Sequence, residues 1–282
     1  MDVQYWEYKT LLVPSLFSGF STSVDDYRKQ VIEPVAAATT GTDYQHLHED
    51  TAYTNVEFYD TADGDFNANH FLVRWRYTPG KPEPSDLTLK YRQSQEEPVA
   101  NANVQSSLPG NEIKLKDEVL LPNSLSEFPG MRSDYSKDNE LSSPSCVNLT
   151  GDVDDWVQLF PGLGDLNLPG ATAVNIVNGI VIQQAQVEIC ELKFHGANGG
   201  EIKAKGDIAL WVNTNQQQYY SEYLAAEFSY SFKSLTGPPP ADALAVCNSF
   251  YEGLQAKPYQ SWIQDEGTKT SAVYDPTLAS GC

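Results

Sequence analysis

The chain has 282 residues, enough for one large domain or two small ones, and a formal net charge of −20 at pH 7. Its hydrophobic content of 40% and its 16 tyrosines are compatible with a folded core, which argues against wholesale disorder. We do not expect so acidic a chain to bind nucleic acid or an anionic membrane, because both favour positively charged partners. No apolar run approaches the roughly 18 residues that a membrane-spanning helix needs.

Four cysteines and one glycosylation sequon bear on the compartment. Cys146, Cys190, Cys247 and Cys282 form no C-x-x-C pair, which disfavours a zinc ribbon. Their even number and the sequon at 148–150 favour a secreted protein or another oxidising compartment. The alternative is a cytoplasmic protein with four free thiols. We expect at least one disulfide, Cys247–Cys282, because it would anchor an otherwise aperiodic tail.

The first half of the chain predicts five strands and one helix. Alternation of polar and apolar residues predicts strands over the ranges 3–13, 54–65, 70–80, 85–94 and 111–121. Residues 23–40 predict a helix, with Ser23 as its N-cap and acidic residues in its first turn. Pro34 is expected to end or kink this helix.

The second half begins with a change of composition. Residues 122–172 are rich in Ser, Asp, Pro and Gly, and they predict a loop-rich insertion with one short helix at 154–163. A helical period behind a run of prolines predicts a further helix near 240–256. We therefore divide the chain into a main domain over 1–237 and a C-terminal helix and extension over 238–282. Strands are predicted between these parts over 175–184, 186–194, 200–213 and 222–235.

Charged residues gather on one face of the predicted strands. Arg74 and Arg76 are two residues apart, so in a strand they point to the same side, whereas Val73 and Trp75 point to the other. A solvated face with cross-strand ion pairs is one explanation of this pattern. Of the 18 Lys and Arg residues, 11 fall in predicted strands: Lys9, Arg74, Arg76, Lys90, Arg92, Lys114, Lys116, Lys193, Lys203, Lys205 and Lys233.

The second explanation is a closed sheet with a polar interior. The apolar faces are continuous, so helices packed on the outside must cover them. The charged faces would then line a site for an anion, and carboxylates among the cations suggest a metal bound together with a polyphosphate. We therefore predict an α+β fold in which helices pack outside an antiparallel β-barrel.

Several short motifs in the predicted strands resemble those of a known family. In chain order they are "YWEYK" at 5–9, "FYDT" at 58–61, "LVRWR" at 72–76 and "LTLK" at 87–90, followed by the Glu-bearing stretches "VEICELKF" and "AAEFSYSFK". Their order and spacing resemble the CYTH superfamily, the triphosphate tunnel metalloenzymes, which begin with an E-x-E-x-K strand. The resemblance implies an eight-stranded antiparallel tunnel. It is specific over residues 3–92, loose over 110–235, and absent from the insertion at 122–172 and from the tail after 240.

The resemblance also implies roles for individual residues. The catalytic set would be Glu7, Lys9, Arg74 and Arg76. Mg²⁺ or Mn²⁺ held by Glu7, Glu188 and Glu227 would neutralise charge and orient a water for attack on the terminal phosphorus. The anionic small-molecule substrate would be bound by Lys9, Arg74, Arg76, Lys90, Arg92, Lys114, Lys116, Lys193 and Lys203.

Tyr5 departs from the family pattern, because it stands where the first Glu of the E-x-E-x-K motif is expected. A phenol cannot replace a carboxylate as a ligand of Mg²⁺ at neutral pH. The first predicted function is a metal-dependent hydrolase of a triphosphate or related phosphoanhydride. The second is a cyclase or lyase acting on another anionic or phosphorylated small molecule. The third is a non-catalytic polyanion-binding protein, and Tyr5 favours the latter two.

Overall fold

The computed structural model describes residues 2–81, 85–109, 111–142, 149–214, 223–265 and 267–275. Eleven strands in these ranges form one sheet. In chain order they are β1 (Tyr5–Leu12), β2 (Thr42–His46), β3 (Ala52–Thr61), β4 (Phe71–Tyr77), β5 (Ser85–Gln93), β6 (Asn111–Leu120), β7 (Arg132–Ser142), β8 (Val174–Ile176), β9 (Ile182–His195), β10 (Glu201–Asn213) and β11 (Ala225–Lys233).

The helices of the described residues are α1 (Phe20–Tyr27), α2 (Glu33–Ala38), α3 (Asp65–Ala68), α4 (Glu96–Asn101), α5 (Val153–Leu159), α6 (Ala241–Leu254) and α7 (Ser271–Tyr274). A π-helical turn, η2 (Arg28–Ile32), joins α1 to α2 without a break. Pro34 therefore does not end the predicted helix; it lies in the first turn of α2. The short 3₁₀ segments are η1 (Pro14–Phe17), η3 (Leu125–Glu127), η4 (Pro161–Leu166), η5 (Val177–Gly179) and η6 (Lys257–Trp262).

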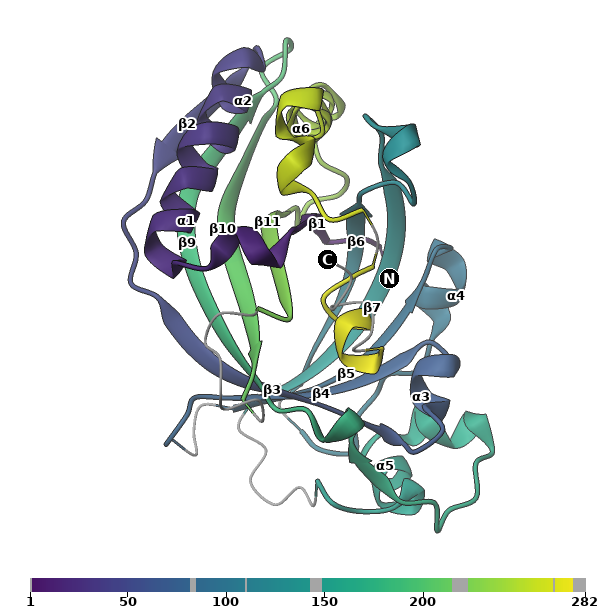
Figure 1. The fold of residues 1–282 in the computed structure, drawn as a ribbon. Coiled ribbons are helices and arrows are strands. Elements are labelled where there is room, and N and C mark those ends of the chain that lie inside the picture. Colours follow the sequence, from purple (N-terminus) through teal and green to yellow (C-terminus); the bar gives the residue numbers. More distant parts are fainter. Residues whose placement is uncertain are drawn as a thin grey trace.

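The sheet curves around a central space and closes on itself where β3 pairs with β9 (Figure 1). The order is β2-β9-β10-β11-β1-β6-β7-β5-β4-β3-β8, and β9 pairs in addition with β3. The strands from β9 round to β3 therefore form a closed cycle, to which β2 is added beside β9 and β8 beside β3.

Among the described residues, the one parallel pairing of the sheet joins β1 to β6. The strand β1 pairs antiparallel with β11, with Tyr5 opposite Lys233, and parallel with β6, with Tyr5 opposite Lys116. The prediction of eight antiparallel strands is therefore wrong in the number of strands and in this pairing. The α+β class and the outer helices are as predicted.

One large core lies between the outer face of β9, β10, β11 and β1 and the helices α1, α2 and α6 (Figure 1). On β10 the residues Ile202 and Ile208 point into this core, where they meet Phe250 of α6. Each fully buried side chain of this size stabilises the fold by about 1.5–3 kcal/mol relative to exposure. The apolar face of the strands is thereby covered, and their polar face is left toward the central space.

The range 122–172 contains a strand that the sequence did not reveal. Residues predicted as loop form β7, which pairs with both β5 and β6. The remainder of the range includes α5, close to the helix predicted at 154–163, and its N-cap Asp152 forms a capping box with Asp155. Trp156 of α5 is buried in a second core beneath β4 and β5.

A β-bulge interrupts the pairing of β9 with β10. Gly206 lies opposite Cys190 and Asp207 lies opposite Glu188, so Ile189 is an extra residue on β9. An extra residue shifts the alternation of the strand by one. The predicted strand 186–194 is part of β9, whereas the predicted strand 175–184 is divided among β8, η5 and the start of β9.

The predicted helix near 240–256 is present as α6. The predicted disulfide Cys247–Cys282 is not formed, because Cys247 is a free thiol. It lies on the inward face of α6, fully buried, with its Sγ 3.9 Å from the Tyr230 hydroxyl. Cys190 is also free and buried, whereas Cys146 and Cys282 lie outside the described residues.

Within the described ranges, no helix combines the length and the apolar character needed to cross a membrane.

Candidate functional site

The inner face of the sheet encloses a cavity of about 710 Å³. Side chains of β1, β3, β4, β5, β6, β7, β9, β10 and β11 line it, and the chain from Gln264 to Asp275 contributes a further wall. The lining is rich in charge because the polar face of each strand points inward while the apolar face meets the cores.

Six of the predicted phosphate-binding cations line this cavity: Lys9, Arg74, Arg76, Lys90, Arg92 and Lys116. They come from β1, β6, β5 and β4, which lie on one side of the cyclic strand order. Arg132 of β7 and Lys269 of the C-terminal segment also line the cavity, and the sequence analysis assigned no role to either.

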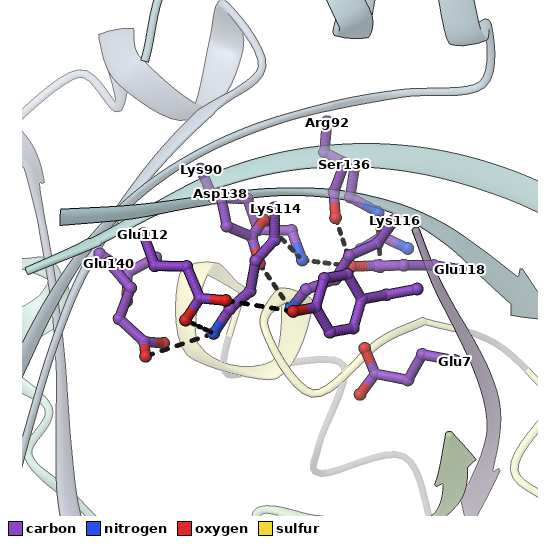
Figure 2. A network of polar contacts seen from close by, with 12 residues as sticks. Glu7, Lys90, Arg92, Glu112, Lys114, Lys116, Glu118, Ser136, Asp138 and Glu140 are labelled. Carbon is purple, nitrogen blue, oxygen red and sulfur yellow. Dashed lines mark hydrogen bonds and ion pairs between the residues drawn. The ribbon is translucent and has the colours of Figure 1, made fainter. Parts of the chain in front are cut away.

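Three other predicted cations do not line the cavity. Lys114 lies between Glu112 and Glu140, with its Nζ 3.2 and 3.6 Å from their carboxylates (Figure 2). Lys193 and Lys203 each pair with the glutamate two positions earlier in the same strand, at 3.4 and 3.3 Å. Both stand near the β9–β10 hairpin, where the strands extend past the cavity.

Glu118 of β6 is the centre of a charged network (Figure 2). Its fully buried side chain accepts hydrogen bonds from Lys90 and, at 2.9 Å, from the Ser136 hydroxyl. Lys9 Nζ and Arg92 Nε lie 3.1 and 3.3 Å from its Oε2. Burial opposes ionisation, but these three cations outweigh it and hold the pKa of Glu118 well below its usual range.

Asp138 of β7 is a second buried counter-charge in the same network. Lys116 Nζ lies 2.6 Å from its Oδ2, and Lys90 Nζ lies 3.8 Å from its Oδ1. Burial would raise the pKa of Asp138, but the two ammonium groups hold it below its usual range. Glu118 and Asp138 together fix the positions of the lysines.

Arg74 differs from its neighbours because no carboxylate of the described residues lies within 4.0 Å of its guanidinium. Its Nη2 donates to the Thr88 hydroxyl at 3.3 Å, and its Nε has no partner. Burial and the neighbouring Arg76 lower the pKa of Arg74 to about 10, so it remains charged at pH 7. Arg74 therefore presents open donors to the cavity.

Arg76, two residues further along β4, is already partly neutralised. Its Nη2 lies 3.2 Å from Glu140 Oε2 and 3.5 Å from Asp86 Oδ2. The two arginines share a face of the strand, as the sequence predicted, but they differ in the charge that each leaves available.

Three carboxylates line the side of the cavity that β1, β11 and β10 form: Glu7, Glu227 and Asp207. Glu7 Oε2 lies 3.1 Å from Lys9 Nζ, and Glu227 Oε1 lies 2.8 Å from Lys269 Nζ. Burial raises the pKa of Asp207 to about 7.

A chain of hydrogen bonds orients Asp207. The Trp211 indole donates to Gln184 at 2.7 Å, Gln184 donates to Gln186 at 2.8 Å, and Gln186 donates to Asp207 Oδ1 at 2.8 Å. Each of the two glutamine amides accepts a hydrogen bond at its carbonyl oxygen and donates one from its NH₂ group. The orientation of both amides and of one Asp207 oxygen is therefore fixed.

The predicted metal ligands Glu7, Glu188 and Glu227 do not come together. Glu188 does not line the cavity; its Oε2 lies 2.9 Å from Lys205 Nζ on the exposed part of β10. Within the described ranges, no three His, Cys, Asp or Glu side chains lie close enough together to hold a metal ion. Carboxylates suit Mg²⁺ or Mn²⁺ as ligands, but Glu227 is paired with Lys269 instead.

Tyr5 points to a different partner. Its hydroxyl donates to Glu112 Oε1 at 3.1 Å, and Lys233 Nζ lies 4.7 Å from its ring centre. Tyr5 does not line the cavity, so the position of the family's first Glu contributes no group there.

The sequence analysis assigned no site role to four carboxylates that strands of the sheet bring to the cavity: Glu118, Asp138, Glu140 and Asp207. Glu118 and Asp207 stand in predicted strands on the charged face, so their alternation was the available signal. Asp138 and Glu140 lie on β7, whose polar composition resembled a loop.

Comparison with known proteins found no matching family model and no matching curated protein. The solved structures that resemble the chain include the following three. A candidate adenylyl cyclase from Hippeastrum with a dominant triphosphatase activity is 12% identical over 98% of this chain and 96% of its own, with a TM-score of 0.41. A candidate adenylate cyclase from Bacillus halodurans is 11% identical over 95% and 96%, with a TM-score of 0.39. A protein from Pyrococcus horikoshii OT3 is 11% identical over 93% and 94%, with a TM-score of 0.32.

Proposed function

We propose that the cavity binds a small-molecule triphosphate or a related phosphoanhydride and hydrolyses it. The observation that carries this proposal is the open guanidinium of Arg74, which lacks a carboxylate partner beside other cations of the cavity. A guanidinium offers a planar fork of donors that matches phosphate oxygens. A bound phosphate group would satisfy the donors that the described protein leaves open.

The ion pairs of the neighbouring lysines support binding of a substrate in a fixed position. Glu118 and Asp138 hold Lys90 and Lys116, so these ammonium groups are placed before an anion arrives. Donors fixed in advance stabilise charge without the cost of reorganising during the reaction. Among the residues that the structure describes, the cavity thus offers one guanidinium without a carboxylate partner and several positioned ammonium groups.

Asp207 is the carboxylate in the cavity suited to activate water. Its pKa of about 7 matches the acidity expected of a general base near neutral pH, and Gln186 orients one of its oxygens. In the proposed step a water oxygen forms a bond to the terminal phosphorus, and the bond to the bridging oxygen breaks. Asp207 takes the proton from the water, and the leaving phosphate carries away the electron pair.

Dependence on Mg²⁺ or Mn²⁺ is part of the proposal. Such an ion, bound with the polyphosphate, would neutralise phosphate charge. Glu7 and Glu227 are the predicted ligands that line the cavity and would hold it.

Binding of a polyanion without catalysis is the second candidate. The observation that favours it is the position of Tyr5, which pairs with Glu112 and leaves the cavity with one acid fewer than the family motif implies. Phosphate release from tripolyphosphate with Mg²⁺ or Mn²⁺ separates the two candidates, because a simple binder releases none.

The direct test is the affinity for tripolyphosphate, measured by calorimetry. Arg74→Ala should weaken it by roughly ten- to a hundred-fold, since a charge-assisted contact is worth about 1.5–3 kcal/mol. Arg74→Lys should restore only part, because Lys lacks the planar fork. Arg76→Ala should cost less, because Glu140 and Asp86 already share its charge.

The matched control for this test is Lys257→Ala, which removes an exposed cation that does not line the cavity. It should leave the affinity unchanged. Equal affinities of the wild type and Arg74→Ala would refute an anion site at Arg74.

A further inference from the structure

Three neighbouring strands place a carboxylate, a hydroxyl and an ammonium group in one row on the inner face of the sheet. Asp207 of β10 lies opposite Ser229 of β11, and Ser229 lies opposite Lys9 of β1. The three strands run side by side (Figure 1), and all three residues line the cavity. Neighbouring strands are about 4.8 Å apart, so the row spans about 10 Å. Ser229 therefore stands between the proposed base and a predicted phosphate ligand.

The hydroxyl of Ser229 is buried but only loosely held. The residue is 6% exposed, and its hydroxyl donates to Asp207 Oδ2 at 3.5 Å. Most O–H···O hydrogen bonds are about 2.5–3.0 Å long, so this one is at the long limit. The contact uses the donor of the hydroxyl and neither of its two acceptor sites.

The two oxygens of Asp207 have different partners. Oδ1 accepts the hydrogen bond from Gln186 at 2.8 Å, whereas Oδ2 faces Ser229. An ionised carboxylate has about four acceptor sites, two on each oxygen. Oδ2 can therefore accept a second hydrogen bond beside the long one from Ser229.

One water can bridge the two side chains, as water commonly does where a polar contact is long. It would donate one hydrogen to Asp207 Oδ2 and the other to Ser229 Oγ. With both hydrogens held at the strands, a lone pair of the water points into the cavity. Lys9 is the next residue of the row, and the buried Glu118 holds its Nζ at 3.1 Å. A phosphate group bound by Lys9 would thus lie next to this water.

We propose that Ser229 is a catalytic residue, which together with Asp207 holds the water that attacks the terminal phosphorus. This inference rests on the proposed function, since it names a further residue of the same reaction. The water oxygen forms a bond to phosphorus while the bond to the bridging oxygen breaks. One proton of the water passes to Asp207 Oδ2, and the leaving phosphate keeps the electron pair. Ser229 holds the second hydrogen and exchanges no proton.

The test compares the rate of phosphate release from tripolyphosphate, with Mg²⁺ or Mn²⁺, with the affinity for tripolyphosphate. Ser229→Ala should lower kcat by at least about tenfold, because a water held at one point loses the orientation that the step needs. The affinity, measured by calorimetry, should not change, since the cations that bind the anion remain. A kcat equal to that of the wild type would overturn the proposal.

Two further variants test whether the hydroxyl itself matters. Ser231→Ala is the matched control, because Ser231 lies two residues further along β11, is exposed and does not line the cavity. It should keep both the kcat and the affinity of the wild type. Ser229→Thr retains a hydroxyl on a residue that suits a strand, so it should recover most of the lost kcat. A Thr variant as slow as the Ala variant would contradict a role of the hydroxyl.

A second measurement uses the unaltered protein and needs no turnover. A crystal structure that shows ordered water should contain a water within about 3.2 Å of both Ser229 Oγ and Asp207 Oδ2. Direct contact of the two side chains without such a water would overturn the proposal. A phosphate group attached to Ser229 during turnover, detected by mass spectrometry, would also overturn it, because the hydroxyl would then be the nucleophile.

The outcomes separate this inference from the proposed function. Phosphate release by the wild type together with an unchanged kcat in Ser229→Ala would leave the hydrolysis standing and remove the role of Ser229. A water bridging Ser229 and Asp207 in a protein that releases no phosphate would support the water site and remove the hydrolysis.

Discussion

Glu118 is the counter-charge for three cations, so its removal tests the whole network. Glu118→Gln keeps the shape of the side chain but leaves Lys9, Lys90 and Arg92 without this partner. Loss of one partner from a buried charge network costs about 3–5 kcal/mol. We expect the free energy of unfolding, measured in urea, to fall by that amount.

The control for this variant is Glu112→Gln on the same strand. The Glu112 side chain is 57% exposed and pairs with Lys114, so its loss should change stability by no more than about 1 kcal/mol. Equal losses in the two variants would show that burial of Glu118 does not matter.

The difference between wild type and Glu118→Gln should also depend on pH. The folded pKa of Glu118 is depressed, so its contribution is fully present above the unfolded pKa of about 4.3. It is lost as the pH falls through the folded pKa. The two unfolding curves should therefore converge in acid.

For Asp207 we expect the opposite dependence of folding stability on pH. Its folded pKa of about 7 lies above the unfolded value of about 3.9, so the folded state holds a proton that the unfolded state releases. The contribution of Asp207 to wild-type stability should therefore decline as the pH rises from about 4 to about 7, and the full cost of the ionised carboxylate remains above that range.

Asp207→Asn removes the titrating group and should not share this decline. With chelator present to exclude metal, the variant should be more stable than the wild type at pH 8 by more than about 1 kcal/mol. The advantage should vanish near pH 4. A constant difference across this range would mean that Asp207 does not hold the proton in the folded protein.

Sequence alternation predicted the shared face of Arg74 and Arg76, but not the difference between them. That difference depends on register across the sheet: Arg74 lies opposite Thr88, and Arg76 lies opposite Asp86. Register is a property of two strands and of the turn between them, so the pattern of one strand cannot supply it.

At the scale of elements, Gly206 lies beside the bulge between β9 and β10 and has no room for a side chain. A Cβ there would lie 2.6 Å from Cys190 Sγ and 3.1 Å from the Phe228 ring. Overpacking of this kind costs typically 1–3 kcal/mol. Gly206→Ala should therefore lower the free energy of unfolding by about that amount.

The double variant Gly206→Ala with Cys190→Ala tests the cause. Removing the sulfur makes room for the new methyl group, so the double variant should be more stable than the sum of the two single changes predicts. Strict additivity would exclude the clash with Cys190 as the reason.

The same bulge explains why Glu188 and Lys193 were hard to place from sequence. They are five residues apart and would face opposite sides of a regular strand, yet the extra residue at Ile189 changes the alternation between them. Nothing in the composition of this stretch marks the position of the extra residue.

β7 was missed for a different reason. Strand prediction relies on apolar residues, whereas β7 presents Ser136, Asp138 and Glu140 to a charged interior. A strand whose partners are cations resembles a surface loop in composition. Its burial becomes evident only when β5 and β6 are placed on either side of it.

At the scale of the molecule, the cavity and the surface differ in charge. The formal charge of the chain is −20, yet the cations of the cavity are largely balanced by their own carboxylates. The excess negative charge therefore lies elsewhere. Its repulsion of an anion is screened beyond about 8 Å at physiological salt, so Arg74 and the lysines must attract a substrate at short range.

The closed arrangement of the whole sheet was predictable because alternating strands need cover on one face and a polar space on the other. The strand count was not predictable. β2 and β8 are short additions to the cycle, and the single predicted strand 175–184 is divided among β8, η5 and the start of β9.

The place of β1 in the sheet has a consequence for how the protein is made. One edge of β1 pairs with β11, so residues 5–12 lack their partner on that edge until residues 225–233 have left the ribosome. At about 5–20 residues per second this delay is on the order of ten seconds or more. Throughout it the aromatic face of β1, with Trp6 and Tyr8, lacks the stacked rings of Phe232 and Tyr230. The nascent chain thus carries an unfinished sheet edge through most of its synthesis, and such an edge can pair with a strand of another chain.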